Sequence, residues 1–277
     1  MDHNHQKKIA VINDFCGFGR CSISVALPII SAMKIQCCPL PTALFSNHTG
    51  FDHFYWSDCT EHMDHYADEW ANLGLRFEGI ATGFLGSVEQ IEIVERFLQR
   101  FGTENNLVLV DPVMGDYGSL YPTYTMELAQ SMKQLVKYAH ILTPNLTEAC
   151  VLTGTPYHSM PSKDTLLEMC EQLSAMGPEQ VVISGLDYGD TLGNFIYERN
   201  GIHQLLNVSK VGLCRSGTGD VFSSILIADL VNGASLTEAV TKAANFISVA
   251  LKRTMELDIP RTDGICFEEF LGELVQS

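Results

Sequence analysis

Short apolar runs alternate with helical patterns along this chain of 277 residues, and that alternation most constrains its fold. The runs predict buried strands at residues 8–13, 35–46, 77–82, 107–111, 140–143 and 180–184. Helical patterns are predicted at residues 22–33, 58–73, 88–101, 220–231, 235–255 and 267–275. A helix between two strands makes the strands parallel, so we expect one sheet with helices on both faces.

A tight hairpin is predicted near residue 200, where Asn200 and Gly201 separate residues 193–199 from residues 202–208. The expected fold is therefore α/β, in three layers α/β/α, with a mostly parallel central sheet and an antiparallel edge hairpin. Because no Pro/Gly/Ser-rich linker or repeat divides the chain, residues 1–277 are expected to form a single domain. Residues 1–7 are polar and are expected to be a disordered tail.

The formal net charge of −16 argues against a nucleic-acid or acidic-membrane partner, since both require a basic face. No apolar run approaches the length of a membrane span, and residues 1–8 do not resemble a signal peptide. Nine cysteines without a Cys-x-x-Cys pair are typical of thiols in a reducing cytosol. The chain is therefore expected to be cytoplasmic and to bind small molecules.

Residues 217–220, Gly-Thr-Gly-Asp, stand directly before an apolar helix. Backbone amides at a helix N-terminus bind anions, because they lack intrahelical acceptors and the helix dipole favours negative charge. Asp220 would repel such an anion, which suggests that it removes a proton beside a phosphate. The alternative is a simple glycine turn in which Asp220 compensates the helix dipole. These four residues alone do not decide between the two.

Polar residues also follow six of the predicted strands, at the sheet edge where ligands of such folds bind. They lie at residues 13–14, 46–50, 82–84, 111–116, 143–148 and 184–185. Any one of these groups could be a turn or a cap, and Asn145 with Glu148 makes a plausible capping pair. Six at one sheet edge, beside the turn at residues 217–220, favour a functional site.

The types of residue in this predicted site suit phosphoryl transfer, which needs positioning and charge neutralisation. The amides of Gly217, Thr218 and Gly219 can hold the phosphoryl group, and Asp220 can take the proton of an attacking hydroxyl. Asp111, Asn145 and Glu148 offer hard oxygen ligands for Mg²⁺, with contacts expected through water. Phe45, His48 and Phe84 offer flat faces for an aromatic substrate, although each phenylalanine could equally belong to the core.

Four strings carry a family resemblance, in order and with matching spacing. They are Phe-Ser-Asn-His-Thr-Gly at 45–50, Asp-Pro-Val-Met-Gly-Asp at 111–116, Thr-Pro-Asn at 143–145 with Glu148, and Gly-Thr-Gly-Asp at 217–220. The chain resembles the pyridoxal kinase family of the ribokinase-like superfamily, over nearly its whole length. The resemblance implies transfer of the ATP γ-phosphate to the 5′-hydroxymethyl group of pyridoxal, pyridoxamine or pyridoxine, with Asp220 as the base.

The resemblance also implies positions for the substrates. Thr49 and the residues after the first strand, Asn13 and Asp14, should contact the pyridine ring. The residues that should face ATP and its Mg²⁺ are Asp111, Asp116, Asn145, Glu148, Ser184 and Thr218, with Asp111 and Glu148 as the metal-side carboxylates. A homodimer is expected, residues 117–124 are a candidate lid, and a requirement for a monovalent cation such as K⁺ is left open.

Two departures from the family pattern affect the acceptor pocket. Asn13 and Asp14 stand where many pyridoxal kinases have a serine and a histidine, and this segment is more similar to hydroxymethylpyrimidine kinases. An aspartate near a ring nitrogen favours the protonated ring. Phe84 replaces a tyrosine that often follows Thr-Gly.

Two alternatives are therefore kept, a hydroxymethylpyrimidine kinase and a non-catalytic sensor of B6 vitamers, although a sensor would not need Asp220. Cys214 is either an inert thiol or one that reacts reversibly with an aldehyde.

Overall fold

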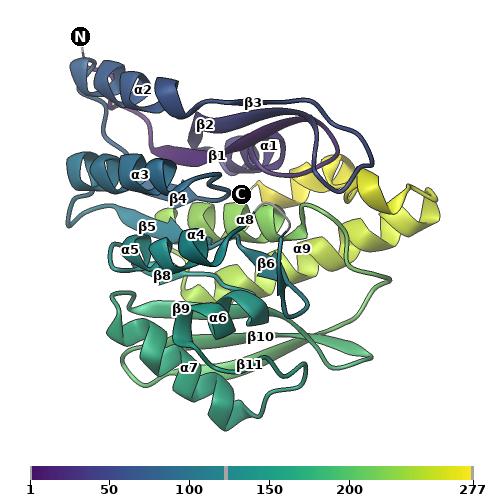
Figure 1. Ribbon diagram of the computed structural model, residues 1–277. Helices are drawn as coiled ribbons and strands as arrows, with labels where there is room; N and C mark the ends of the chain where they lie inside the picture. Colours follow the sequence, from purple (N-terminus) through teal and green to yellow (C-terminus); the bar gives the residue numbers. More distant parts are fainter. Residues whose placement is uncertain (1, 122–123, 276–277) are drawn as a thin grey trace.

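The computed structural model describes residues 2–121 and 124–275, and Figure 1 shows how its helices and strands are arranged. In this part of the chain nine strands form the main sheet, in the order β11-β10-β9-β8-β5-β4-β1-β2-β3. The strands are β1 (Lys8–Phe18), β2 (Gln36–Asn47), β3 (Trp56–Asp58), β4 (Gly79–Thr82), β5 (Leu107–Val110), β8 (Ile141–Leu142), β9 (Gln180–Asp187), β10 (Thr191–Glu198) and β11 (His203–Ser209).

The centre of the sheet is parallel, from β9 through β8, β5, β4 and β1 to β2. Strands β9, β10 and β11 pair antiparallel at one edge, and Asn200 and Gly201 connect β10 to β11. The predicted α/β architecture with an antiparallel edge hairpin is confirmed. The short strand β3, which pairs antiparallel with β2 at the opposite edge, was not predicted.

Helices cover both faces of the sheet, as Figure 1 shows. One core lies between the sheet and α1 (Ile23–Ala32), α8 (Thr218–Val231) and α9 (Leu236–Glu256). The core on the other face includes residues of α2 to α7. These helices are α2 (Thr60–Asn72), α3 (Val88–Phe101), α4 (Met126–Ser131), α5 (Lys133–Val136), α6 (Leu146–Thr153) and α7 (Lys163–Ala175). Because α1, α8 and α9 share one face, the glycine-rich turn before α8 lies over the strand ends on that side.

Three local expectations differ from the structure. Strand β1 continues to Phe18 instead of ending near residue 13, because it keeps pairing with β2 through a register shift between Asn13 and Phe15. The C-terminal segment forms two 3₁₀ helices, η1 (Arg261–Asp263) and η2 (Glu268–Leu274), instead of an α-helix over residues 267–275. A small hairpin, β6 (Gly115–Asp116) with β7 (Ser119–Leu120), also forms within the region expected to be a loop.

The N-terminal residues make contacts with the body of the protein. The Asn4 side-chain amide donates to the Gly74 carbonyl, and its oxygen accepts from the Arg76 amide. The Lys7 ammonium donates to the Val231 carbonyl. Among the helices in the described part of the chain, none is both long and apolar enough to cross a membrane.

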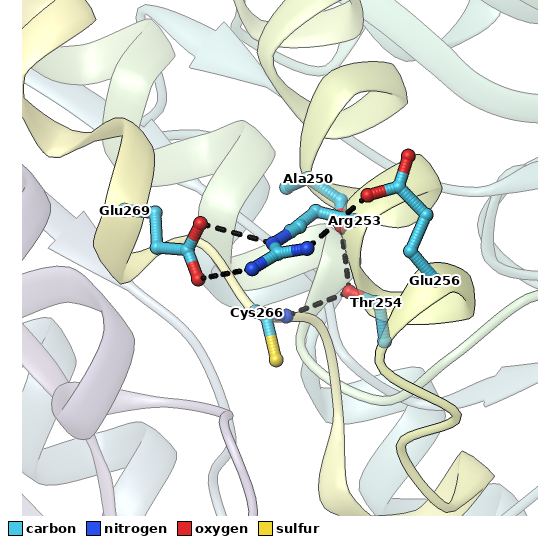
Figure 2. A network of polar contacts seen from close by, with 6 residues as sticks. All are labelled: Ala250, Arg253, Thr254, Glu256, Cys266 and Glu269. Atoms are coloured by element: carbon cyan, nitrogen blue, oxygen red, sulfur yellow. Dashed lines mark hydrogen bonds and ion pairs between the residues drawn. The ribbon is translucent and has the colours of Figure 1, made fainter.

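Figure 2 shows how the end of α9 holds the C-terminal segment. Arg253 forms a two-pronged ion pair with Glu269, at 3.0 Å from Nε and 3.2 Å from Nη2. The buried Thr254 hydroxyl donates to the Ala250 carbonyl at 2.6 Å and accepts from the Cys266 amide at 2.8 Å. These contacts fold the last residues back onto α9. Thr262, just before these residues, reaches His48 in the site described next.

Candidate active site

The strand order places a switch point between β1 and β4. From β1 the chain proceeds to β2 on one side of the sheet, and from β4 it proceeds to β5 on the other side. In open α/β sheets ligands bind beyond the carboxyl ends of the strands at such a point. Asn13 ends the part of β1 that precedes its register shift, and Gly83 directly follows β4. The first turn of α8 carries Asp220 to the same place, since Asp220 contacts Asn13.

Gly217 and Gly219 occupy different structural environments in the turn before α8. Gly217 caps α8 with a φ of 81°, and a Cβ there would lie 1.7 Å from the Arg20 carbonyl oxygen, so only glycine fits. A Cβ on Gly219 would meet no atom within 4 Å among the described residues, and this glycine is exposed. The first amides of α8 have no acceptors within the helix, so they are available to an anion.

Asp220 is held by hydrogen bonds on the side of β1. Its Oδ1 accepts from the Asn13 Nδ2 at 3.2 Å, and the Ser22 backbone amide also donates to its carboxylate. Burial raises the pKa of Asp220 to about 6, and the nearby Asp14 carboxylate adds to the rise, while these hydrogen bonds oppose it. A carboxylate with this pKa is still ionised at neutral pH and is a stronger base than an ordinary aspartate.

Asp14 is buried beside Asp220. Its Oδ1 accepts from the Ser22 hydroxyl at 2.6 Å, and its Oδ2 accepts from the Cys16 thiol at 3.2 Å. No ion pair within residues 2–121 and 124–275 includes Asp14. Burial raises the pKa of Asp14, and the hydrogen bonds from Ser22 and Cys16 oppose this rise, with a further small opposing effect from His48. The sequence did not single out Ser22 or Cys16, and no pattern in the chain marks them.

Three carboxyl groups influence one another on the opposite side of Asp220. Burial, together with the Glu148 and Asp220 carboxylates, raises the pKa of Asp111 well above its usual value. Burial also raises the pKa of Glu148 to about 8, and Asp116 adds to this rise. A hydrogen bond from the Ser223 hydroxyl partly offsets the rise in the pKa of Asp111. Ser223 lies one helical turn after Asp220, so this spacing could have indicated it.

The predicted capping pair at Asn145 and Glu148 forms, and it does more than start α6. Each side chain accepts from the other's backbone amide, and Glu148 also accepts from the Met114 amide at 3.0 Å. The Asn145 amide group donates to the Gly115 carbonyl at 2.8 Å. Ser184, at the end of the parallel part of β9, forms a β-bridge to Asn145. The loop after β5 is thereby tied to α6 and β9.

These residues could hold a divalent cation only together with further ligands, such as water or phosphate oxygens. Within the described ranges, no group of three or more His, Cys, Asp and Glu side chains could enclose a metal by itself. Glu148 already accepts two backbone amides, so it would reach a cation through water. Burial and neighbouring carboxyls disfavour the charged forms of Asp111 and Glu148, and Mg²⁺ with phosphate oxygens would favour those forms.

Aromatic side chains line the other end of the site. The Phe45 ring stacks on Trp56 with an interplanar angle of 15° and meets the edge of Phe84, with centroids 6.1 Å apart. His48 Nε2 lies 2.6 Å from the Thr262 carbonyl oxygen, and its Nδ1 accepts from the Gly50 amide. The His48 ring is therefore held by the backbone, with Nε2 as the donor.

Three further predicted residues lie in a turn, in the β6–β7 hairpin and at the start of a helix. Thr49 is exposed in the turn after β2. Asp116 accepts from the Tyr117 amide in the β6–β7 turn, where Tyr117 and Gly118 both have positive φ. Thr218 donates through its hydroxyl to the Arg215 carbonyl at 3.1 Å. Of the candidate lid, residues 122–123 lie outside the described residues.

Comparisons with known proteins agree with this geometry. The family model described as phosphomethylpyrimidine kinase matches residues 28–263. A pyridoxine/pyridoxal/pyridoxamine kinase of Bordetella avium is 31% identical over 87% of this chain and 83% of its own. The chain belongs to the phosphomethylpyrimidine and pyridoxal kinase family. This confirms the resemblance found in the sequence and, at the level of the family, the prediction of a pyridoxal kinase-type phosphotransferase.

Solved structures extend the likeness to the whole fold. A phosphomethylpyrimidine kinase homologue from Bacteroides thetaiotaomicron is 36% identical, with a TM-score of 0.97 over 100% of this chain and 96% of that chain. A second crystal form of that homologue contains pyridoxal, with a TM-score of 0.94 over 98% of this chain and 96% of that chain. Pyridoxal kinase from Lactobacillus plantarum is 26% identical, with a TM-score of 0.90 over 97% and 96% of the two chains. The ribokinase-like fold is confirmed.

Proposed function

We propose that this protein transfers the γ-phosphoryl group of ATP to the 5′-hydroxymethyl group of pyridoxal, pyridoxamine or pyridoxine. The observation that carries the proposal is Asp220, a buried carboxylate with a pKa of about 6 in the first turn of α8, beside backbone amides that have no acceptors within the helix. Membership of the kinase family and the pyridoxal in the crystal of the Bacteroides homologue support it. Asp220 accepts the hydroxyl proton as the phosphoryl group is transferred.

The amides of Gly217, Thr218 and Gly219 hold the transferring phosphoryl group in this proposal. Helix α8 contributes its positive N-terminal end to the same anion. ATP lies toward the ends of β5, β8 and β9, where the residues assigned to it are Asp111, Asp116, Asn145, Glu148, Ser184 and Thr218. Asp111 and Glu148 would hold Mg²⁺ through water, and the ion would neutralise charge on the phosphates.

The acceptor ring lies between the aromatic cluster and Asp220. Phe45, His48, Thr49 and Phe84 are the residues assigned to its faces and substituents. Asp14 is buried without a cationic partner in any ion pair of the described residues, so it favours a ring whose nitrogen carries a proton. Pyridoxal, pyridoxamine and pyridoxine all have such a nitrogen.

A substrate panel tests the proposal. The purified protein is assayed with ATP and Mg²⁺ against pyridoxal, pyridoxamine, pyridoxine and hydroxymethylpyrimidine, with ADP release as the measurement. We expect turnover with at least one B6 vitamer, at a kcat/KM well above that for hydroxymethylpyrimidine. A clear preference for the pyrimidine would overturn the assignment of the acceptor. Binding of pyridoxal without turnover of any vitamer would support a sensor instead.

Further properties belong to the same proposal. Residues 1–277 form a single kinase domain that works as a cytoplasmic homodimer, which light scattering and cell fractionation test. Replacing K⁺ by Na⁺ in the assay tests for a monovalent cation. The candidate lid at residues 117–124 stays a prediction. Cys214 is exposed, and Cys214→Ala with unchanged pyridoxal kinetics would identify it as inert.

A further inference from the structure

We infer that Asn13 positions Asp220 and links it to the loop that carries Phe84, instead of contacting the substrate ring. The inference deepens the proposed function, because it takes Asp220 as the base. It changes the role of Asn13, which the sequence assigned to substrate binding.

The orientation of the Asn13 amide is determined by its partners. Its Oδ1 accepts from the Phe84 amide at 2.8 Å and from the Asp14 amide at 2.9 Å. Only the oxygen of the side chain can accept two N–H groups, so the NH₂ group must face Asp220. Its Nδ2 lies 3.2 Å from Asp220 Oδ1. Asn13 is 7% exposed, so both oxygen acceptor sites are used inside the protein and little surface is left for a ligand.

Gly83 shows how closely the chain packs around this amide. A Cβ at Gly83 would lie 2.4 Å from Asn13 Nδ2, so any other residue would push the amide away from its place. Gly86, three residues later in the same loop, is a matched control, because a Cβ there would meet its nearest atom at 3.7 Å. Neither glycine has a positive φ, so the comparison isolates the close contact with Asn13.

The three contacts join three elements at the switch point. Asn13 lies on β1, Phe84 follows β4, and Asp220 lies on α8. A displacement of the Phe84 loop therefore moves the group that orients the base. Preorganised donors of this kind need no rearrangement during the reaction, which is why removing one costs kcat more than KM.

The first test is Asn13→Asp, which has nearly the same shape. The new carboxylate still accepts from the Phe84 and Asp14 amides, but it has no N–H for Asp220 and repels it. We expect kcat to fall by about 100-fold, with the KM values for ATP and vitamer within about twofold of the unmodified protein. Retention of kcat within threefold would overturn the inference, and so would a loss that appears only in KM.

The second test leaves the amide chemistry unchanged. Gly83→Ala should lower kcat about tenfold, while Gly86→Ala leaves it within about twofold. Crystal structures of both variants should show Asn13 and Asp220 displaced only by Gly83→Ala. Equal kinetics for the two variants, or an unmoved Asp220 in Gly83→Ala, would contradict the positioning role.

A third test does not depend on activity. Asn13→Asp lowers the melting temperature, and Asp220→Asn in the same molecule should recover several degrees, because donor and acceptor are exchanged across one contact. Additive melting shifts would show that the two side chains are not coupled and would overturn the inference. If the unmodified protein phosphorylates no vitamer, the proposed function fails, and this cycle with the Gly83→Ala structure still decides the role of Asn13.

Discussion

Two groups of charged side chains in this protein differ in the signs of their charges and in their exposure to solvent. At the end of α9, Arg253 meets Glu256 and Glu269 at the surface, where unlike charges satisfy one another. At the switch point, Asp111, Glu148 and Asp220 are like charges in a largely enclosed site. The surface pairs raise the pKa of Arg253 and so favour its charged form, whereas enclosure raises the pKa of each carboxyl and disfavours its charged form.

The contrast in charge and exposure indicates different roles for the two groups. Exposed ion pairs contribute little to stability, and solvent can replace either partner. Clustered buried carboxylates are costly until a cation or proton joins them, so a fold keeps them where they act on a ligand. The largest effects should therefore come from the buried group and the smallest from the surface pairs.

Asp220→Asn should have the largest effect. It removes the proton acceptor while keeping the shape, so we expect kcat to fall by about 10²–10⁴-fold. ATP affinity, measured by calorimetry, should change only a few-fold, because Asp220 is assigned to the acceptor and not to the nucleotide. If Asp220→Asn keeps more than a tenth of the normal kcat, Asp220 is not the catalytic base.

The pH dependence of stability is the next test. A folded-state pKa of about 6, against 3.8 for the ordinary carboxyl, means that the folded state holds the proton more tightly. The resulting stability is complete below pH 3.8 and is lost as pH rises through about 6, by up to about 3 kcal/mol. The free energy of unfolding of Asp220→Asn, relative to that of the unmodified protein at the same pH, should therefore rise between pH 4 and pH 7.5.

Asp111→Asn is the matched variant for this experiment, because it removes one like charge but leaves Asp220 in place. Its free energy of unfolding, relative to that of the unmodified protein, should also rise with pH. Urea unfolding at several pH values measures both. If the free-energy difference from the unmodified protein stays constant across this range, the carboxyls do not interact as described.

Thr254→Val tests the C-terminal attachment without touching any charge. Valine leaves the buried Cys266 amide without its acceptor, which should cost about 1–3 kcal/mol. The free energy of unfolding measures this, and Thr254→Ser is the control that keeps the hydroxyl. Equal stability of the valine and serine variants would show that the hydroxyl bridge is not what holds the segment.

Arg253→Gln should have the smallest effect. The Arg253 pairs are solvent-exposed, so we expect the melting temperature to fall by about 2 °C or less. The small difference should shrink further in 0.5 M salt, because screening weakens exposed pairs first. A larger, salt-independent loss would mean that the surface group is as tightly coupled as the buried one.

Much of the fold could be predicted from local patterns. The helix at residues 88–101 was predicted with its observed ends, because Ser87 caps it and its apolar face is regular. The Asn145–Glu148 capping box and the hairpin at residues 200–201 follow from short-range chemistry as well. The family motifs then predicted the reaction, since each string retains its residues and spacing. Strand β3 has only three residues, all exposed, so it has no apolar pattern that would predict it. The 3₁₀ end of the chain depends on contacts with other elements, such as the ion pair of Glu269 with Arg253, which local patterns do not show.

Local sequence patterns were enough to predict the layered α/β architecture, the turn at residues 217–220 and the family to which the chain belongs. How these side chains meet depends on the folded chain. Asn13 and Asp220 are 207 residues apart in the chain and 3.2 Å apart at the switch point. The pKa of Asp220 and the orientation of the Asn13 amide both depend on burial and on partners from other elements, and a linear sequence does not specify those distances.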